Sequence, residues 1–109
     1  MFGIGNYVRA FDGLGDVGPG FPYTVKSGDG LSQITWKFGR AGAEVVDLYN
    51  VNAGQVGGPP DFGVKLGQTV VLPAGWPAKT VRSGRADKAW QAAALEALKT
   101  IGYVKPGPP

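Results

Sequence analysis

Cysteine and histidine are both absent from this sequence of 109 residues. Their absence excludes disulfide bonds, metal sites with cysteine or histidine ligands, a cysteine nucleophile and a histidine general base. We therefore expect no enzymatic activity, no cofactor and no bound metal. Asp12 and Asp16 lie in a glycine-rich stretch that cannot hold two carboxylates rigidly, so a glycosidase is not expected either.

Charged residues are scarce as well. They make up 17% of the chain, and the net charge of +3 is too small to predict a nucleic-acid partner. Within this small total, a group of cations gathers in the last third of the chain, where only Asp87 opposes it. Such a group is typical of a surface that is solvated or pairs with acidic groups. Its members are Lys79, Arg82, Arg85 and Lys88.

Long apolar runs are missing. No run approaches the roughly 18 residues that a membrane span requires, so we expect no membrane span. The first residues lack the basic and apolar regions of a secretory signal. We therefore expect synthesis in the cytoplasm without Sec export.

Glycine and proline are abundant by contrast, with 19 and 9 residues. Many of them lie within residues 1–22, interleaved with aromatic and aliphatic side chains. Flexible linkers carry few aromatics, so this mixture predicts an extended arm that orders against another surface. In the alternative interpretation, Phe2, Tyr7 and Phe11 fold back over the chain's own core.

Apolar side chains change their spacing along residues 23–73. Alternating residues predict strands, apolar residues three or four apart predict short helices, and clustered glycine and proline predict a loop. A two-stranded sheet is marginal alone, so the helices must pack on it. We therefore expect an α+β domain with a strand at 23–26, a helix near 30–38, a second helix at 43–51 after Gly42, a loop at 53–63 and a strand at 69–72. The predicted core comprises Val25, Leu31, Ile34, Phe38, Val45, Leu48, Val64, Val70 and Leu72.

Residues 77–109 predict a linker, a helix near 84–101 and a proline-rich tail. Gly102 stands where a glycine commonly ends a helix. The helix packs either across its own domain or on a neighbouring molecule, and the sequence leaves both interpretations open. Its apolar face consists of Trp90, Ala94, Leu98 and Ile101.

Several blocks in this order resemble a LysM domain. The opening block at 23–34 reads YTVKSGDGLSQI, and Phe38-Gly39 follows it. A third block at 47–52 reads DLYNVN, and the closing block at 64–73 reads VKLGQTVVLP. The resemblance covers residues 23–73 and places a LysM-like domain at 23–76.

The resemblance implies a non-catalytic βααβ fold that binds peptidoglycan or chitin through N-acetylglucosamine. The glycan groove of the family lies between the loop after the first strand and the loop before the second. By position, one wall would be Gly28, Asp29, Gly30 and Leu31, and the other would begin at Asn52, Ala53 and Gly54. Gly30 replaces the usual threonine or serine, so Asp29 is left as a possible helix cap. The loop at 52–67 is longer than is usual in the family, and its residues 59–62 could cover or remodel the groove.

Trp36 lies off the apolar stripe of its predicted helix. An exposed tryptophan is typical of a contact with another protein, although Phe11 or Phe21 of the arm is an alternative cover. Small LysM-like proteins without export signals are similar to components of phage tails and baseplates. We therefore expect a structural adaptor in such a particle, bound to other proteins of a multi-subunit assembly, with a peptidoglycan-binding module of the cell wall as the alternative. The predicted partner contacts are Phe2, Tyr7, Phe11, Phe21, Trp36 and Trp90.

Overall fold

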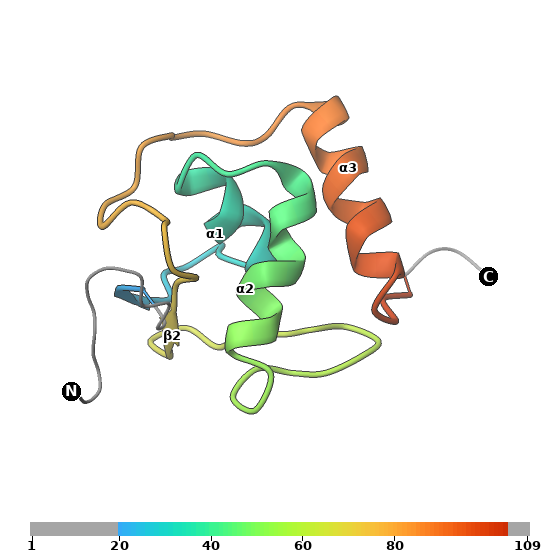
Figure 1. Cartoon of the computed structure of the whole chain (residues 1–109), viewed down its shortest axis with the longest axis horizontal. Helices are drawn as coiled ribbons and strands as arrows, with labels where there is room; N and C mark the ends of the chain where they lie inside the picture. Colours follow the sequence, from blue (N-terminus) through green and yellow to red (C-terminus); the bar gives the residue numbers. More distant parts are fainter. Residues whose placement is uncertain (1–19, 105–109) are drawn as a thin grey trace.

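A computed structural model describes residues 20–104 of the chain (Figure 1). The elements are β1 (Pro22–Thr24), α1 (Leu31–Lys37), the 3₁₀ helix η1 (Gly42–Glu44), α2 (Val45–Val51), β2 (Thr69–Val71) and α3 (Lys88–Lys99). The expected α+β class and the order of the elements are confirmed. The predicted arm contacts Phe2, Tyr7 and Phe11 and the proline-rich tail lie outside the described residues.

The sheet consists of β1 and β2 in antiparallel pairing, with Tyr23 opposite Val70. Pro22 begins β1 at a position opposite Val71. A proline is tolerated there because it lies at the start of an edge strand, where its missing N–H costs no bond to β2. A backbone hydrogen bond from Val25 N to Gln68 O (2.8 Å) continues the pairing beyond β1.

Asn52 closes the side of β2 that faces away from β1. Its amide nitrogen donates to Val71 O at 2.7 Å and to Leu48 O at 2.8 Å, and its amide oxygen accepts from Val71 N at 2.8 Å. The side chain is buried, so these three bonds satisfy polar groups that water cannot reach. The Asn52 side chain thus makes the hydrogen bonds that a neighbouring strand would make to Val71, and it connects the end of α2 to the sheet.

The core agrees with the predicted one except at Val64, which is only partly buried. Leu31, Ile34 and Phe38 of α1 and its end are buried, as expected from their spacing. Several further core residues lie outside the predicted core: some come from the long loop and the segment after β2, and others come from the predicted apolar face of α3. These are Val56, Phe62, Trp76, Ala94 and Leu98.

α3 begins at Lys88, four residues later than expected, because Gly84 has a positive φ and Asp87 caps the helix by accepting from Trp90 N at 2.8 Å. Its end is confirmed: Gly102 N donates to Lys99 O and Tyr103 N to Leu98 O, the pair of bonds of a Schellman motif. No helix within the described range 20–104 has the length and apolar character needed to cross a bilayer.

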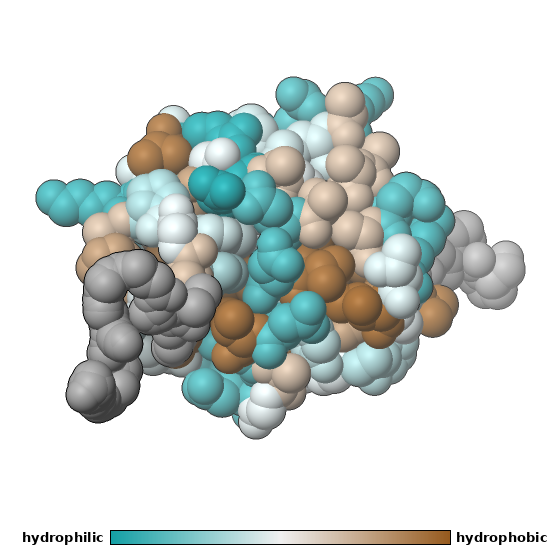
Figure 2. All heavy atoms as spheres, viewed as in Figure 1, coloured by the Kyte–Doolittle hydropathy of each residue, from teal (hydrophilic) through white to brown (hydrophobic). Residues whose placement is uncertain are grey.

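α3 packs on its own domain, which confirms one of the two interpretations left open by the sequence. It contacts η1 and α2, and it buries Ala94 and Leu98 in the common core. Apolar side chains also reach the surface along the seam between α2 and α3 (Figure 2). The domain therefore has the two-stranded sheet on one side, α1 and α2 in the middle and α3 on the far side (Figure 1).

Gly42 permits the close contact between η1 and α3. As predicted, it lies between α1 and α2, where it begins η1, and η1 runs directly into α2. A Cβ atom at Gly42 would lie 2.7 Å from both Ala94 N and Trp90 O, which are backbone atoms of α3. Only glycine fits at this distance, so the position of α3 depends on it.

We expect Gly42→Ala to destabilise the domain by about 2 kcal/mol, because the methyl group would push the backbone of α3 outward. Urea unfolding measures the change in the free energy of unfolding. Gly54→Ala is the matched control, since a Cβ atom at Gly54 meets nothing within 4 Å. Equal stabilities of the two variants would contradict the close packing of η1 and α3.

Candidate functional site

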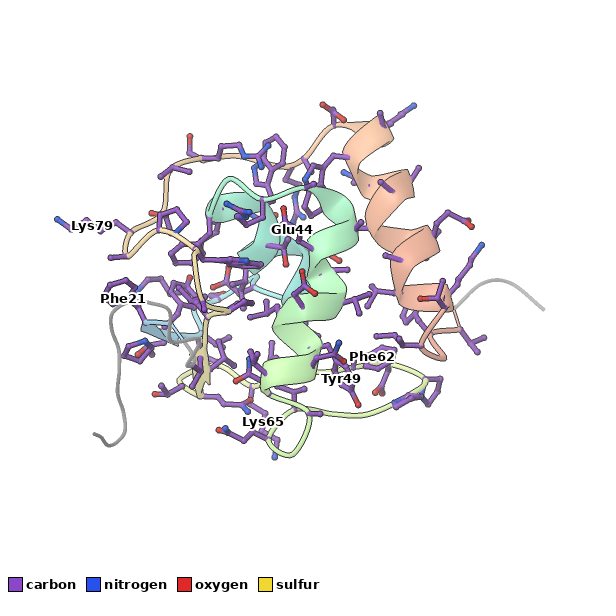
Figure 3. All side chains as sticks on the ribbon, in the orientation of Figure 1. Phe21, Glu44, Tyr49, Phe62, Lys65 and Lys79 are labelled. Atoms are coloured by element: carbon purple, nitrogen blue, oxygen red, sulfur yellow. The ribbon has the colours of Figure 1, made fainter. Side chains whose placement is uncertain are left out.

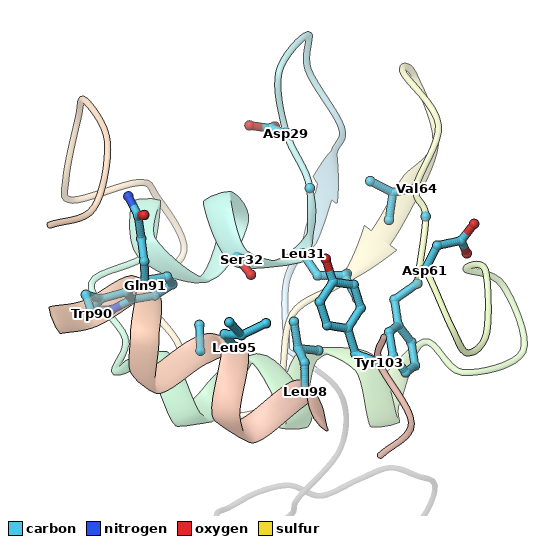
Figure 4. A pocket seen from close by; sticks show the side chains of 14 residues that line it. Asp29, Leu31, Ser32, Asp61, Val64, Trp90, Gln91, Leu95, Leu98 and Tyr103 are labelled. Atoms are coloured by element: carbon cyan, nitrogen blue, oxygen red, sulfur yellow. The ribbon is translucent and has the colours of Figure 1, made fainter. Parts of the chain in front are cut away.

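A pocket of about 420 Å³ opens between the start of α1, the loop before β2 and α3 (Figure 4). Tyr103 and Asp61 lie at one end of it, and Trp90 and Gln91 lie at the other. Three walls enclose it. They are formed by residues 29–32, by residues 61–64, and by α3 together with Tyr103.

A second cavity of about 310 Å³ continues the first. It extends past the first turn of α3 and reaches Arg85 and Ala86 on one side and Gly28 and Gln33 on the other. The two cavities together form one continuous groove along α3, and "the groove" refers to both cavities together. They share Gly30, Ser32, Trp90 and Gln91.

Asp29 holds the first wall in place through a network with Tyr23 and Lys37. The Tyr23 hydroxyl donates to the Asp29 carboxylate at 2.5 Å, and Lys37 Nζ forms an ion pair with it at 2.9 Å. The backbone N–H of Lys26 donates to the same carboxylate at 3.0 Å. The Asp29 side chain is only 3% exposed, so the network fixes the turn between β1 and α1. The sequence suggested Asp29 as a cap of α1, and this prediction is wrong, because α1 has no side-chain cap.

The network changes the acidity of its members. Burial alone would raise the pKa of Asp29, but the hydrogen bonds from Tyr23, Lys26 and Lys37 and the charge of Lys37 outweigh it and lower the pKa below its ordinary value. Burial would likewise lower the pKa of Lys37, yet its bonds to Tyr23 and Asp29 raise it. Both groups are therefore charged across the neutral range.

Phe62 fixes the second wall. It is buried although it lies in a loop, and its ring packs edge-to-face on Tyr49 of α2 at 4.7 Å (Figure 3). Its φ of +47° is uncommon for a residue with a side chain. Hydrogen bonds from Phe62 N to Gly58 O and from Gly57 N to Gly63 O close the loop around it. The loop before β2 is thus a packed wall of the groove.

Two carbonyl groups, one in the last turn of α1 and one three residues beyond it, hold the segment that leads into α3. Lys37 O accepts from Val81 N at 2.7 Å and from Arg82 N at 3.0 Å. Arg40 O accepts from the Arg82 guanidinium and from Trp90 Nε1, each at 2.8 Å. These bonds attach the third wall to the first.

Trp36 is half-buried and has partners inside the chain, so the exposed position predicted from the sequence is wrong. Its ring packs edge-to-face against Trp90 at 5.6 Å, and the Arg82 guanidinium lies 3.9 Å from its centroid. Phe21, another predicted partner contact, is 51% exposed. Contact of these residues with another protein stays a prediction.

The structure divides the predicted glycan residues into two groups. Asp29, Gly30 and Leu31 line the larger cavity, and Gly28 lines the smaller one. Asn52 is buried with its amide engaged, and neither cavity is lined by Ala53 or Gly54. The second wall comes instead from residues 61–64. The unusual length of the loop at 52–67 had indicated that this loop could remodel the groove. Nothing in the sequence indicated that α3 would supply a third wall.

Comparison with models of known protein families, with curated proteins and with solved structures finds no match to this chain. The groove and its chemistry are therefore the basis for assigning a function. Its ionisable side chains are Asp29, Asp61, Arg85 and Tyr103, set among apolar and amide groups. Such a surface can pack on a ligand and exchange hydrogen bonds with it.

We expect Asp29→Asn to destabilise the domain by about 2 kcal/mol near pH 7, because it leaves the Lys37 ammonium without its counter-charge. The lowered pKa of Asp29 means that its contribution is present above about pH 4 and is lost as the pH falls through the pKa of the folded state. The raised pKa of Lys37 means that its contribution persists until the pH exceeds its ordinary pKa of about 10.4.

Urea unfolding between pH 2 and pH 9 measures this difference. The deficit of the variant should be largest between about pH 5 and 9 and should shrink below about pH 4. Glu96→Gln is the control, since it removes an exposed ion pair with Lys99 that should add little stability. A deficit that stays constant with pH would show that the charge of Asp29 contributes nothing.

We expect Gly30→Ser to stabilise the chain by about 0.5 kcal/mol. Gly30 is the N-cap of α1 with an extended backbone, and a Cβ atom there meets nothing within 4 Å. A serine hydroxyl can therefore cap the helix, and the unfolded chain loses freedom. Gly28→Ser is the matched control. Its Cβ atom also has open space, but its φ of +86° disfavours a side chain, so it should destabilise the chain by about 1 kcal/mol. Thermal unfolding compares the two, and a lower midpoint for Gly30→Ser would contradict the role of Gly30 as N-cap.

Proposed function

We propose that this chain contains a LysM-like, non-catalytic module that binds the N-acetylated sugars of peptidoglycan in the groove. One observation carries the proposal: the groove lies between the loop after β1 and the loop before β2, where the resemblance places the glycan site. The volumes of its cavities, about 420 and 310 Å³, fall within the roughly 300–1,000 Å³ of ligand sites.

The chemistry of the groove fits an acetamido sugar. The acetamido group combines a methyl group with an amide donor and acceptor, so it needs apolar and polar partners side by side. Leu31 and Val64 flank the backbone amides of Gly30 and Gly63 on the first two walls. The Tyr103 ring offers a flat apolar face of the kind that packs on a sugar ring.

The rigidity of the walls also supports binding. Asp29 is fixed by three donors, and Phe62 is fixed by Tyr49 and the loop bonds. A site that is held in shape before the ligand arrives loses less conformational entropy on binding. The groove therefore does not need to be assembled by its ligand.

A structural adaptor within a phage tail or related particle is the second candidate. The sequence favours it, but Trp36 already packs on Trp90, which weakens the argument from an exposed Trp36. What favours it is exposed apolar surface at both ends of the described chain: Phe21 is 51% and Val104 is 68% exposed. β1 and the end of α3 lie on opposite sides of the domain, so the two ends could contact two neighbours (Figure 1). The particle is the proposed location for this function, and the cell wall is the alternative for glycan binding alone.

We expect chitotetraose to shift backbone amide NMR signals of Gly30, Leu31, Gly63 and Val64 in a saturable manner and to leave those of Ala53 and Gly54 unchanged. Ser32→Phe should weaken binding about tenfold or more. Ser32 points from α1 toward α3 across the groove, so the phenyl ring of the variant would fill the space for the ligand (Figure 4).

Thr80→Phe is the matched control. Thr80 is exposed and lies outside both cavities, so an added ring there should not change the affinity. Saturable shifts at Ala53 and Gly54 would move the site to the family's usual second wall. A flat titration would reject glycan binding of this kind and leave the adaptor as the proposed function.

A further inference from the structure

The groove has one cationic end. Arg85 lines the smaller cavity, whereas Asp61 lines the far end of the larger one. The carboxylate of Asp29 lies between them, but Lys37 neutralises it at 2.9 Å. The electrostatic potential of the groove therefore rises toward Arg85.

The Arg85 guanidinium has no carboxylate partner among residues 20–104. The nearest acid in the sequence, Asp87, is engaged in capping α3 through Trp90 N. An arginine beside a cavity and without a counter-charge of its own is suited to a carboxylate of a ligand, because its planar fork can donate two parallel hydrogen bonds.

The backbone around Arg85 is held on both sides. Gln33 Nε2 donates to Gly84 O at 3.1 Å, and Gln91 Nε2 donates to Ala86 O at 2.7 Å. Both glutamines also line the smaller cavity. The base of the Arg85 side chain is thus fixed to α1 and α3, and only the side chain itself must become ordered when a ligand binds.

The two cavities share residues and form one continuous groove, so the groove has room for more than a single sugar. A neutral glycan would leave the cationic end unused, whereas an acidic one would complement it. We propose that the groove selects an acidic N-acetylated glycan, with an acetamido sugar in the larger cavity and the carboxylate of a neighbouring sugar at Arg85. This inference rests on the proposed glycan binding and specifies its ligand class.

Two ligands that have the same sugars and differ only at their carboxyl groups test the selection. One is a peptide-free peptidoglycan tetrasaccharide with free muramic carboxylates, and the other is the same tetrasaccharide with those carboxylates amidated. Isothermal titration at low salt should give about three- to tenfold tighter binding of the acidic form. The difference should shrink in 0.5 M salt, where the charges are screened.

Arg85→Gln should remove the difference between the two ligands. Lys79→Gln is the matched control, because it causes the same change in net charge at an exposed residue outside the groove, and it should keep the difference. Equal affinities of the intact chain for the two ligands, or an equal loss of the difference in both variants, would overturn the selection by Arg85 and leave glycan binding intact. Binding of neither ligand would overturn the proposed function and this inference with it.

Discussion

The C-terminal end of α1 is the point on which the rest of the structure depends. The last carbonyl groups of a helix lack partners within the helix and must find them elsewhere. Here Lys37 O, in the last turn of α1, accepts from Val81 and Arg82. Arg40 O, three residues beyond the helix, accepts from Trp90, which brings α3 against the domain. The side chain of Lys37 reaches the other way and holds Asp29. One short helix end thus positions two of the three walls of the groove.

This arrangement explains how a sheet of two short strands belongs to a stable domain. A lone two-stranded sheet is marginal in water. Asn52 satisfies the outer side of β2, the helices bury Val70, and α3 adds Ala94 and Leu98 to the core. The groove lies where these additions meet, so its shape follows from the same contacts that stabilise the fold. Changes to the packing of α3 should therefore affect stability and ligand binding together.

Local signals predicted the parts of the structure that depend on neighbouring residues in the sequence. The spacing of Leu31, Ile34 and Phe38 identified α1, and Gly102 marked the end of α3. Long-range contacts were not predictable in this way. Trp36 was expected at the surface because the residues that cover it, Arg82 and Trp90, lie about fifty positions later. The larger part of the groove's third wall was missed for the same reason, since a helix with one apolar face does not reveal which surface it covers.

The two candidate functions are compatible on physical grounds. The groove opens to solvent, and a site of this kind gains only a modest free energy from one oligosaccharide, because part of the ligand stays in water. Several copies held on one particle would bind a repeating polymer at many points at once, and the effective concentration of the later contacts would raise the overall affinity by orders of magnitude. Exposed Phe21 lies in neither cavity lining, whereas exposed Val104 directly follows Tyr103, which lines one end of the groove. A chain that contacts its neighbours through Phe21 would keep the groove open, so assembly into a particle through that end would strengthen glycan binding instead of competing with it.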